Sequence, residues 1–416
     1  MEALSNSPQK RTFSAHLQNL NSLLLVAFAF VLPLWIAPSY IIAGLICFFW
    51  LLQGDFRSDF EKIRHNKLVW AVVAYFLLHV IGLLWTSNLA AGPNKVARAS
   101  LFLLVPVFMM VLNDENVEPV IWSFLVAMIV SCIFSFLIYF RVDPVHFKPN
   151  GAGFPIYFMS HIHYSVYLAF AIAFSVYYLL FEPSSRKWLK IVAGIVSAML
   201  IFDLFICEGR AGQVIFFVFL VITIFQYFGK KWIRALIVLL IAVPLLFAVA
   251  YTTVKPFRER VQAGVCDIRQ YQENKATSLG QRFVYAKNSF NLFLEHPLFG
   301  VGTGDFENEL EKIHKRDTPD IVYDVDPHNM YLLEMGQFGI FGLIVLLSLL
   351  LSEINIAFRS EIPIQKYLGF SMPIMFALIM FSDIYLQLHF TAMLFILLSA
   401  IVYRDYSHHG QLGVDE

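Results

Sequence analysis

Charged side chains are scarce in this sequence. Asp, Glu, Lys and Arg together make up 14% of the 416 residues, whereas hydrophobic residues make up 58%. A soluble domain has about a quarter charged residues and close to half apolar ones. The composition therefore excludes an ordinary soluble protein and indicates an integral membrane protein. The formal net charge is zero, which argues against a nucleic-acid-binding protein.

Cysteine is also rare, and common catalytic motifs are missing. The four cysteines (Cys47, Cys132, Cys207 and Cys266) lack the spacing of zinc or redox sites, so we interpret them as packing residues. The sequence has no nucleophile elbow and no H-E-x-x-H motif. The glycine-rich segment 296–304 lacks the Lys-Ser/Thr of a phosphate-binding loop. We therefore expect no nucleotide site, no bound metal and no cofactor.

Long apolar runs dominate the sequence. A membrane-spanning helix needs about 20 apolar residues. Twelve runs are candidates, but the second and the last two are short or closely joined, which leaves ten or eleven spans as an alternative. The first run has no small-residue cleavage site after it, which favours a retained span over a signal peptide. We predict an all-α integral membrane protein with about 12 transmembrane helices, at approximately 19–37, 39–53, 67–85, 97–113, 119–140, 160–181, 188–207, 212–229, 234–253, 328–352, 365–383 and 386–403.

The distribution of basic residues predicts the orientation. If both termini are cytoplasmic, the inner segments hold fifteen Lys and Arg residues and the short outer segments hold five. This bias follows the positive-inside rule. It divides the chain into helices 1–9 within 1–254, a periplasmic loop at 255–327, and helices 10–12 with a cytoplasmic tail within 328–416. The loop is the only soluble segment large enough to carry a site.

One segment of the loop has the pattern of an amphipathic helix. Apolar residues recur at helical spacing from Phe283 to Leu294, and Pro297 ends the pattern. Such a helix lies on the membrane surface or on the ends of the spans. Arg282 begins it, and this side chain either faces solvent or binds an anion.

The tenth predicted span is preceded by Asp326, Pro327 and His328. Asp326 suits an N-cap and Pro327 suits the first helical position. His328 would then lie in the first turn, at the positive end of the helix dipole. A histidine there tends to stay neutral, which is the form that a general base needs. The same turn could hold an anion, or His328 could only cap the helix or form local hydrogen bonds.

Asp324 and Asp326 form a D-x-D pair. Such a pair can hold a divalent metal that neutralises a diphosphate. Asp326 has a competing role as the N-cap, and the whole loop is acidic, with twelve acidic and ten basic residues. We therefore favour a site without a metal and keep metal binding as an alternative.

Several ionisable residues lie at the outer ends of predicted spans, where each is costly unless it is paired or functional. Arg210 occupies the turn between the seventh and eighth spans. It either pairs with Asp203 or Glu208, or it binds a phosphate through its planar guanidinium. Three further side chains either line a polar site or lie at the membrane interface: Arg98, His161 and His163.

The ordered motifs resemble a known family. They are Trp85-Thr-Ser87, Gly209-Arg-Ala-Gly212, Gln281-Arg282, the segment His296 to Gly304, the segment Pro327 to Leu332, and Gly336-x-x-Gly339-x-x-Gly342. This set resembles the O-antigen ligase and O-antigen polymerase superfamily of bacterial inner membranes. The specific motifs lie between Arg210 and Gly342. One departure is Gly209, where a serine often precedes the arginine.

The resemblance implies a GT-C-like transferase without a metal, which moves a glycan from undecaprenyl diphosphate to an acceptor hydroxyl on the periplasmic face. The acceptor is a sugar of lipid A–core in the ligases and another lipid-linked repeat in the polymerases. Carried over by motif, His328 would be the base, and Arg210 and Arg282 would hold the diphosphate. We add three candidate substrate-binding residues: Asn329, Arg98 and His163.

We predict ligation to lipid A–core as the activity. A polymerase of O-antigen or capsule repeats is the near alternative, because it needs the same diphosphate site and the same base. A transporter of lipid-linked sugars is an alternative of another class, in which the arginines would only guide an anionic headgroup. The long outer loop with a histidine before a helix favours an enzyme, because a transporter needs no one-sided base.

Overall fold

The computed structural model describes residues 8–142, 155–183, 186–270 and 278–404. Within these ranges the protein is all-helical and has no strand, which confirms the predicted fold class. Ten of the described helical segments are long and apolar enough to cross a membrane. The two helices nearest the C-terminus, predicted to be short, contain 17 and 15 residues. The predicted cytoplasmic tail lies outside the described residues.

The described residues up to 253 supply eleven α-helices. They are α1 (Pro8–Val31), α2 (Ile36–Gln53), α3 (Phe56–Ile63), α4 (Lys67–Ile81), α5 (Gly92–Ser100), α6 (Leu104–Val111), α7 (Asp114–Tyr139), α8 (His161–Leu180), α9 (Lys187–Ile206), α10 (Arg210–Phe228) and α11 (Trp232–Thr253). Short 3-10 turns extend α4 and join α5 to α6, so that Gly92–Val111 forms one interrupted span.

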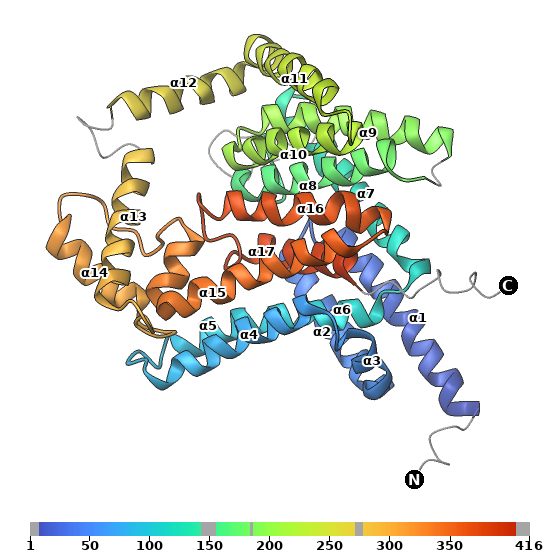
Figure 1. Cartoon of the computed structure of the whole chain (residues 1–416), viewed down its shortest axis with the longest axis horizontal. Coiled ribbons are helices and arrows are strands. Elements are labelled where there is room, and N and C mark those ends of the chain that lie inside the picture. The colour runs from blue at the N-terminus through green and yellow to red at the C-terminus, as the bar shows by residue number, and fades with distance from the viewer. Residues whose placement is uncertain (1–7, 143–154, 184–185, 271–277, 405–416) are drawn as a thin grey trace.

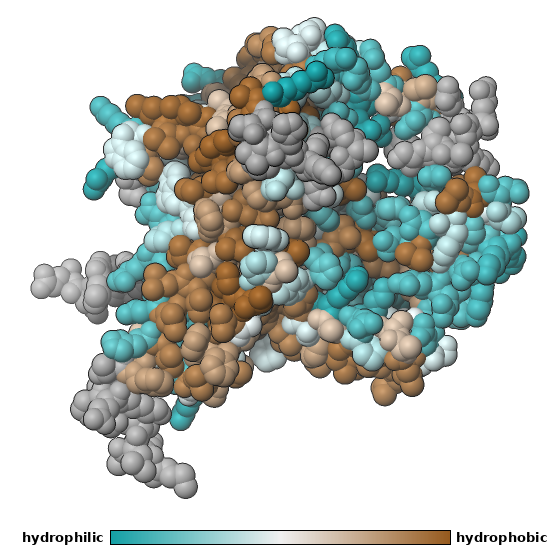
Figure 2. Space-filling model, turned by 180° about the vertical axis from the view of Figure 1, so that it is seen from behind, coloured by the Kyte–Doolittle hydropathy of each residue, from teal (hydrophilic) through white to brown (hydrophobic). Residues whose placement is uncertain are grey.

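The described residues from 255 onward add six α-helices. They are α12 (Lys255–Gln270), α13 (Ser278–Glu295), α14 (Phe306–Asp317), α15 (Met330–Arg359), α16 (Pro363–Ile379) and α17 (His389–Tyr403). The helices α12, α13 and α14 gather at one end of the bundle, which we call the loop end (Figure 1). Figure 2 shows a broad apolar surface over the bundle and a hydrophilic cap at the loop end.

The helices of the loop end follow from simple sequence features. The predicted amphipathic helix is confirmed as α13, which ends at Glu295, two residues before Pro297. Two further helices, α12 and α14, were not predicted. In α14 the first turn carries Glu307 and Glu309, and the last turn carries basic residues. This arrangement complements the helix dipole and stabilises a polar helix that has little apolar pattern.

A backbone break in α15 explains the glycine-rich segment 296–304. Gly339 has φ 62° and ψ −146°, which interrupts the helix inside the bundle. A Cβ atom there would lie 2.3 Å from the carbonyl oxygen of Leu298, so only glycine fits. Beyond the break, the backbone N–H of Ile340 donates to the carbonyl oxygen of Pro297 at 2.9 Å. The glycine-rich segment thus packs on α15 and satisfies backbone groups that the break exposes.

The turn after α4 is fixed by one carboxylate of the loop end. Asp305 accepts hydrogen bonds from the backbone N–H groups of Ser87 and Asn88, at 2.5 and 2.9 Å, and from the hydroxyl groups of Ser87 and Thr86, at 2.8 and 3.1 Å. Burial raises the pKa of Asp305, but these hydrogen bonds outweigh it and the net pKa is lowered. The Thr86–Ser87 motif therefore docks the loop end onto the spans.

Candidate active site

Three arginines line a pocket of about 340 Å³ at the loop end, which we call the arginine pocket. Arg210 comes from the first turn of α10, Arg260 from α12 and Arg282 from α13. The other walls are the start of α8 and the connection between α16 and α17. The structure thus brings Arg210 and Arg282, which are far apart in the sequence, into one cavity. The start of α10 adds the positive end of a helix dipole.

Two carboxylates lie near arginines of the arginine pocket. Arg210 Nη1 lies 3.9 Å from Asp267 Oδ2, which is a long ion pair. Arg260 Nε lies 3.8 Å from Glu208 Oε2 and donates a 3.3 Å hydrogen bond to the backbone oxygen of the same residue. The alternative pairing of Arg210 with Asp203 or Glu208 does not occur, because Asp203 is buried and accepts hydrogen bonds from hydroxyl groups of α7 and α8. The described lining holds three arginines and one carboxylate, Glu208, and this composition suits the binding of an anion.

The turn before α10 is tightly packed. Glu208 has φ 62°, a left-handed conformation that is uncommon for residues other than glycine. A Cβ atom at Gly209 would lie 2.2 Å from the side chain of Ser165 on α8. The Ser165 hydroxyl accepts a 3.3 Å hydrogen bond from the N–H of Gly212. This contact explains why a glycine precedes Arg210 here, since α8 already fills the space of a serine side chain.

The helix start predicted at Asp326 is wrong. The helix α15 begins at Met330, and its N-cap is Asn329, whose side chain accepts a 3.1 Å hydrogen bond from the N–H of Leu332. Asparagine is as good an N-cap as aspartate. His328 has φ 48° and therefore lies before the helix and not in its first turn. Backbone strain of this kind is often retained at functional sites.

His328 lies between two carboxylates. Its Nε2 atom is 3.2 Å from Asp324 Oδ2, and its Nδ1 atom is 3.4 Å from Asp383 Oδ1. Asp383 follows α16 and is 5% exposed. The ring of Tyr285 on α13 covers the imidazole, with ring centroids 5.9 Å apart. We call His328, Asp324, Asp326 and Asp383 the histidine cluster.

The carboxylates of the histidine cluster favour the protonated form of His328, whereas a helix N-terminus would favour its neutral form. The contact with Asp383 raises the pKa of His328 above its ordinary value, although burial and the charge of Arg282 act in the other direction. Burial would raise the pKa of Asp383, but the contact with His328 outweighs it and lowers that pKa. The two shifts agree in direction, as expected for an imidazole in contact with a carboxylate. His328 therefore does not experience the helix terminus that was expected to favour its neutral form, and its pKa is raised by a neighbouring carboxylate.

The histidine cluster adjoins the arginine pocket. Ser382 and Tyr385, which flank Asp383 in the chain, both line the pocket. Arg282 is close enough for its charge to lower the pKa values of both His328 and Asp383. An anion held by Arg282 would therefore lie next to a titratable imidazole.

The other predicted site residues lie at different distances from the arginine pocket and the histidine cluster, and not all of them line either one. Arg98 is exposed on α5 and does not line the arginine pocket. Its charge instead lies near the side chains of Tyr40 and His389. His161 lines the pocket, whereas the ring of His163 packs on Phe390 with centroids 5.6 Å apart. Asn329 acts as a helix cap, and its amide nitrogen lies 3.4 Å from a backbone oxygen of the α16–α17 connection.

Two residues of this site, Asp383 and Arg260, are not among those predicted from the sequence. Asp383 is a lone carboxylate at the end of an apolar run, and that isolation is a signal that could have identified it. Arg260 stands among other charges at 255–260, where nothing in the sequence distinguishes it. Among the described residues, no group of three or more His, Cys, Asp and Glu side chains has an arrangement that could hold a metal ion.

The fold and these contacts define a polytopic helical membrane protein with a cationic pocket beside a histidine–carboxylate cluster. Residues 195–347 match the family model of the O-antigen ligases, and this match supports the O-antigen ligase and polymerase superfamily. The matched segment contains all three pocket arginines and His328, but not Asp383. No curated protein matches the chain.

Proposed function

We propose that this protein transfers a glycan from undecaprenyl diphosphate to a sugar hydroxyl of lipid A–core at the periplasmic face of the inner membrane. The observation that carries the proposal is the convergence of three guanidinium groups in one pocket that adjoins His328. A diphosphate diester carries a negative charge on each phosphate, and planar guanidinium forks bind such groups well.

The reaction forms one bond and breaks one bond. The acceptor hydroxyl oxygen attacks the anomeric carbon of the donor sugar, and the bond from that carbon to the diphosphate oxygen breaks. The electron pair leaves with undecaprenyl diphosphate, whose charge the arginines stabilise. The hydroxyl proton passes to His328, and general-base assistance of this kind contributes roughly 10²–10⁴-fold.

The carboxylates of the histidine cluster suit this role for His328. Asp383 Oδ1 lies 3.4 Å from Nδ1 of the ring, and Asp324 contacts the Nε2 side. Asp383 also stabilises the imidazolium that forms when the proton is accepted, because an opposite charge nearby favours the charged form. For the acceptor hydroxyl to reach Nε2, it has to replace the Asp324 contact, which at 3.2 Å is long for a strong charged hydrogen bond.

Purified protein in proteoliposomes tests the proposal. Wild-type protein, given an undecaprenyl-diphosphate-linked glycan and lipid A–core, should yield glycosylated lipid A–core and free undecaprenyl diphosphate. A transporter would instead move the donor across the bilayer without forming a glycosidic bond. Absence of the glycosylated product with a verified donor and acceptor would contradict the proposal.

A deletion strain separates ligation from polymerisation. A ligase mutant should accumulate lipid-linked polymer and make an unmodified lipid A–core. A polymerase mutant should make lipid A–core that bears one repeat. The second pattern would replace ligation with polymerisation and would retain the same residue roles.

A further inference from the structure

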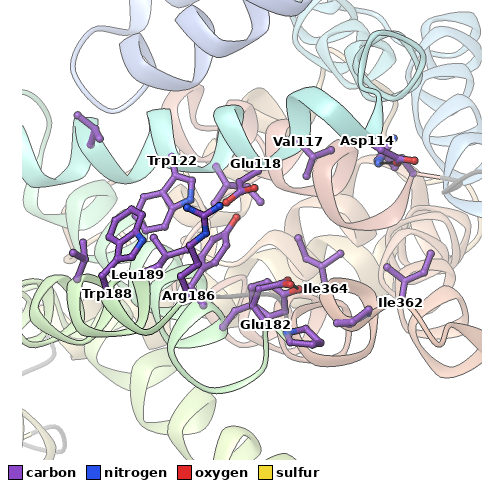
Figure 3. Close-up of a pocket in the computed structure, with 18 of the residues that line it drawn as sticks. Asp114, Val117, Glu118, Trp122, Glu182, Arg186, Trp188, Leu189, Ile362 and Ile364 are labelled. Carbon is purple, nitrogen blue, oxygen red and sulfur yellow. Dashed lines mark hydrogen bonds and ion pairs between the residues drawn. The ribbon is translucent and has the colours of Figure 1, made fainter.

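A second cavity lies at the end of the bundle opposite the loop end. It has a volume of about 950 Å³, near the upper limit of roughly 300–1,000 Å³ for ligand pockets. Its walls come from α7, the end of α8, the start of α9 and the start of α16. Figure 3 shows Trp122, Trp188 and Arg186 on one side of this crevice and Asp114 on the other.

The crevice changes from polar to apolar along α7. Glu118 lies near the start of α7, followed by Trp122, Val126 and Ile129 on the same wall. Ile129 follows Glu118 by eleven positions, which corresponds to about 16 Å of helix at 1.5 Å per residue. This is close to half of the hydrocarbon thickness of a bilayer, which is about 30 Å. The apolar wall therefore has the depth of one lipid leaflet.

The apolar part of the crevice is open on the outer surface of the bundle. Val126, Trp188 and Val192 line it and are 44%, 58% and 38% exposed. Tryptophans are enriched at the headgroup level of membranes, which is where Trp122 and Trp188 would lie near the helix ends. Trp122 packs on Tyr178 with ring centroids 4.9 Å apart, so that an aromatic wall separates the polar end from the apolar end.

The charges at the polar end select the headgroup. Arg404 is already bound to Asp114 and to the backbone oxygen of Leu112, which leaves Arg186 as the guanidinium for a ligand phosphate. In Figure 3 the nitrogens of Arg186 point toward the side of the crevice that carries Glu118. The lining contains three carboxylates and two arginines, so it is acidic overall. An anionic lipid prefers a basic pocket, whereas an ammonium group fits this one.

We propose that this crevice binds a zwitterionic phospholipid with a primary-amine headgroup. Arg186 binds the phosphate, Glu118 accepts hydrogen bonds from the ammonium group, and the wall from Trp122 to Ile129 covers an acyl chain. A primary ammonium has three N–H donors for Glu118, which a quaternary ammonium lacks. The proposal does not depend on the glycan-transfer activity, because none of these residues belongs to the arginine pocket or to the histidine cluster.

Native mass spectrometry of the purified protein tests this binding. The wild-type protein, offered phosphatidylethanolamine, phosphatidylcholine and phosphatidylglycerol at equal concentration, should retain phosphatidylethanolamine preferentially. Equal or stronger retention of phosphatidylglycerol would overturn the proposal, as would the absence of any lipid retained above the detergent background. This comparison uses only the wild-type protein and does not depend on the folding of a variant.

Two substitutions locate the lipid. Arg186→Gln and Glu118→Gln should each weaken phosphatidylethanolamine binding about tenfold, which is the value of one charged hydrogen bond. Both side chains are exposed, so the variants should fold. Glu115→Gln is the matched control, because Glu115 is an exposed residue of α7 that does not line the crevice. Unchanged binding in both variants, or an equal loss in the control, would place the lipid elsewhere.

Discussion

The arginine pocket and the histidine cluster are neighbours with opposite charges. The pocket contains three arginines and a single lining carboxylate, Glu208, among the described residues. In the histidine cluster, Asp324 and Asp383 contact one imidazole, and Asp326 lies near enough for its charge to interact with it. In the first region Arg210 lies 3.9 Å from Asp267, and Arg260 lies 3.8 Å from Glu208. In the second, burial and the charge of Asp324 raise the pKa of Asp326.

The difference in charge suits the two regions to two proposed tasks, which are binding of the diphosphate in the arginine pocket and proton transfer in the histidine cluster. A site with surplus positive charge holds an anionic leaving group, whereas carboxylates around an imidazole stabilise its protonated form. Arg282 lies where the two regions meet, and its charge opposes protonation of His328. In the proposed reaction, the charge of Arg282 would couple the departure of the anion to the uptake of the proton. Variants that affect only one region should separate the two functions.

The strongest test removes the imidazole. His328→Ala should lower glycan transfer by roughly 10²–10⁴-fold, because the proton acceptor is lost. Donor binding should remain near wild type, because the arginine pocket is unchanged. The measurements are initial rates in proteoliposomes and binding of a labelled lipid diphosphate.

His296→Ala serves as the matched control, since His296 is an exposed histidine of the same end that lies outside both regions. If His328→Ala transfers glycan at the wild-type rate, His328 is not the base. If activity instead depends on added Mg²⁺ or Mn²⁺ and is lost in a chelator, the alternative metal site at Asp324 and Asp326 replaces this mechanism.

The next effect concerns the guanidinium forks. Arg210→Lys and Arg282→Lys keep the charge but lose the planar geometry. Loss of a charged hydrogen bond of about 1.5–3 kcal/mol corresponds to a fall of roughly 10–150-fold in kcat/KM. Arg269→Lys is the control, because Arg269 is exposed on α12 and does not line the pocket. Two lysine variants with wild-type kinetics would show that these arginines are structural.

A smaller effect is expected at Asp383, and its signature is a pH shift. Since Asp383 raises the pKa of His328, Asp383→Asn should lower that pKa. The base is active when deprotonated, so the acidic limb of kcat/KM should move to lower pH. At neutral pH the rate should fall about tenfold, because one charged contact that orients the ring is lost. An acidic limb that stays in place or moves to higher pH would contradict this role.

The two regions also differ in how far the sequence could predict them. Arg210, Arg282 and His328 stand in local motifs. The spans follow from long apolar runs, and α13 follows from apolar residues at helical spacing. The surroundings of His328 are set by tertiary contacts with Asp383, which is 55 residues away in the chain. A strong N-cap at Asp326 competed with an equally strong one at Asn329, and no local rule separates them. The conformation of His328 was therefore predicted incorrectly.

The smallest effect tests whether the arginine pocket, unlike the histidine cluster, binds through surplus positive charge. Arg260 contacts Glu208, so these two residues should have opposite effects on the donor. Arg260→Gln removes a cation from the pocket and should weaken donor binding, whereas Glu208→Gln removes its lining carboxylate and should strengthen it. Each change should be about two- to fivefold, as for partly exposed charges, and should shrink at high salt. The rate at saturating donor should stay near wild type, because neither residue contacts His328. Changes of the same sign in both variants would indicate that the Arg260–Glu208 pair only supports the turn before α10, and that Arg210 and Arg282 suffice to hold the anion.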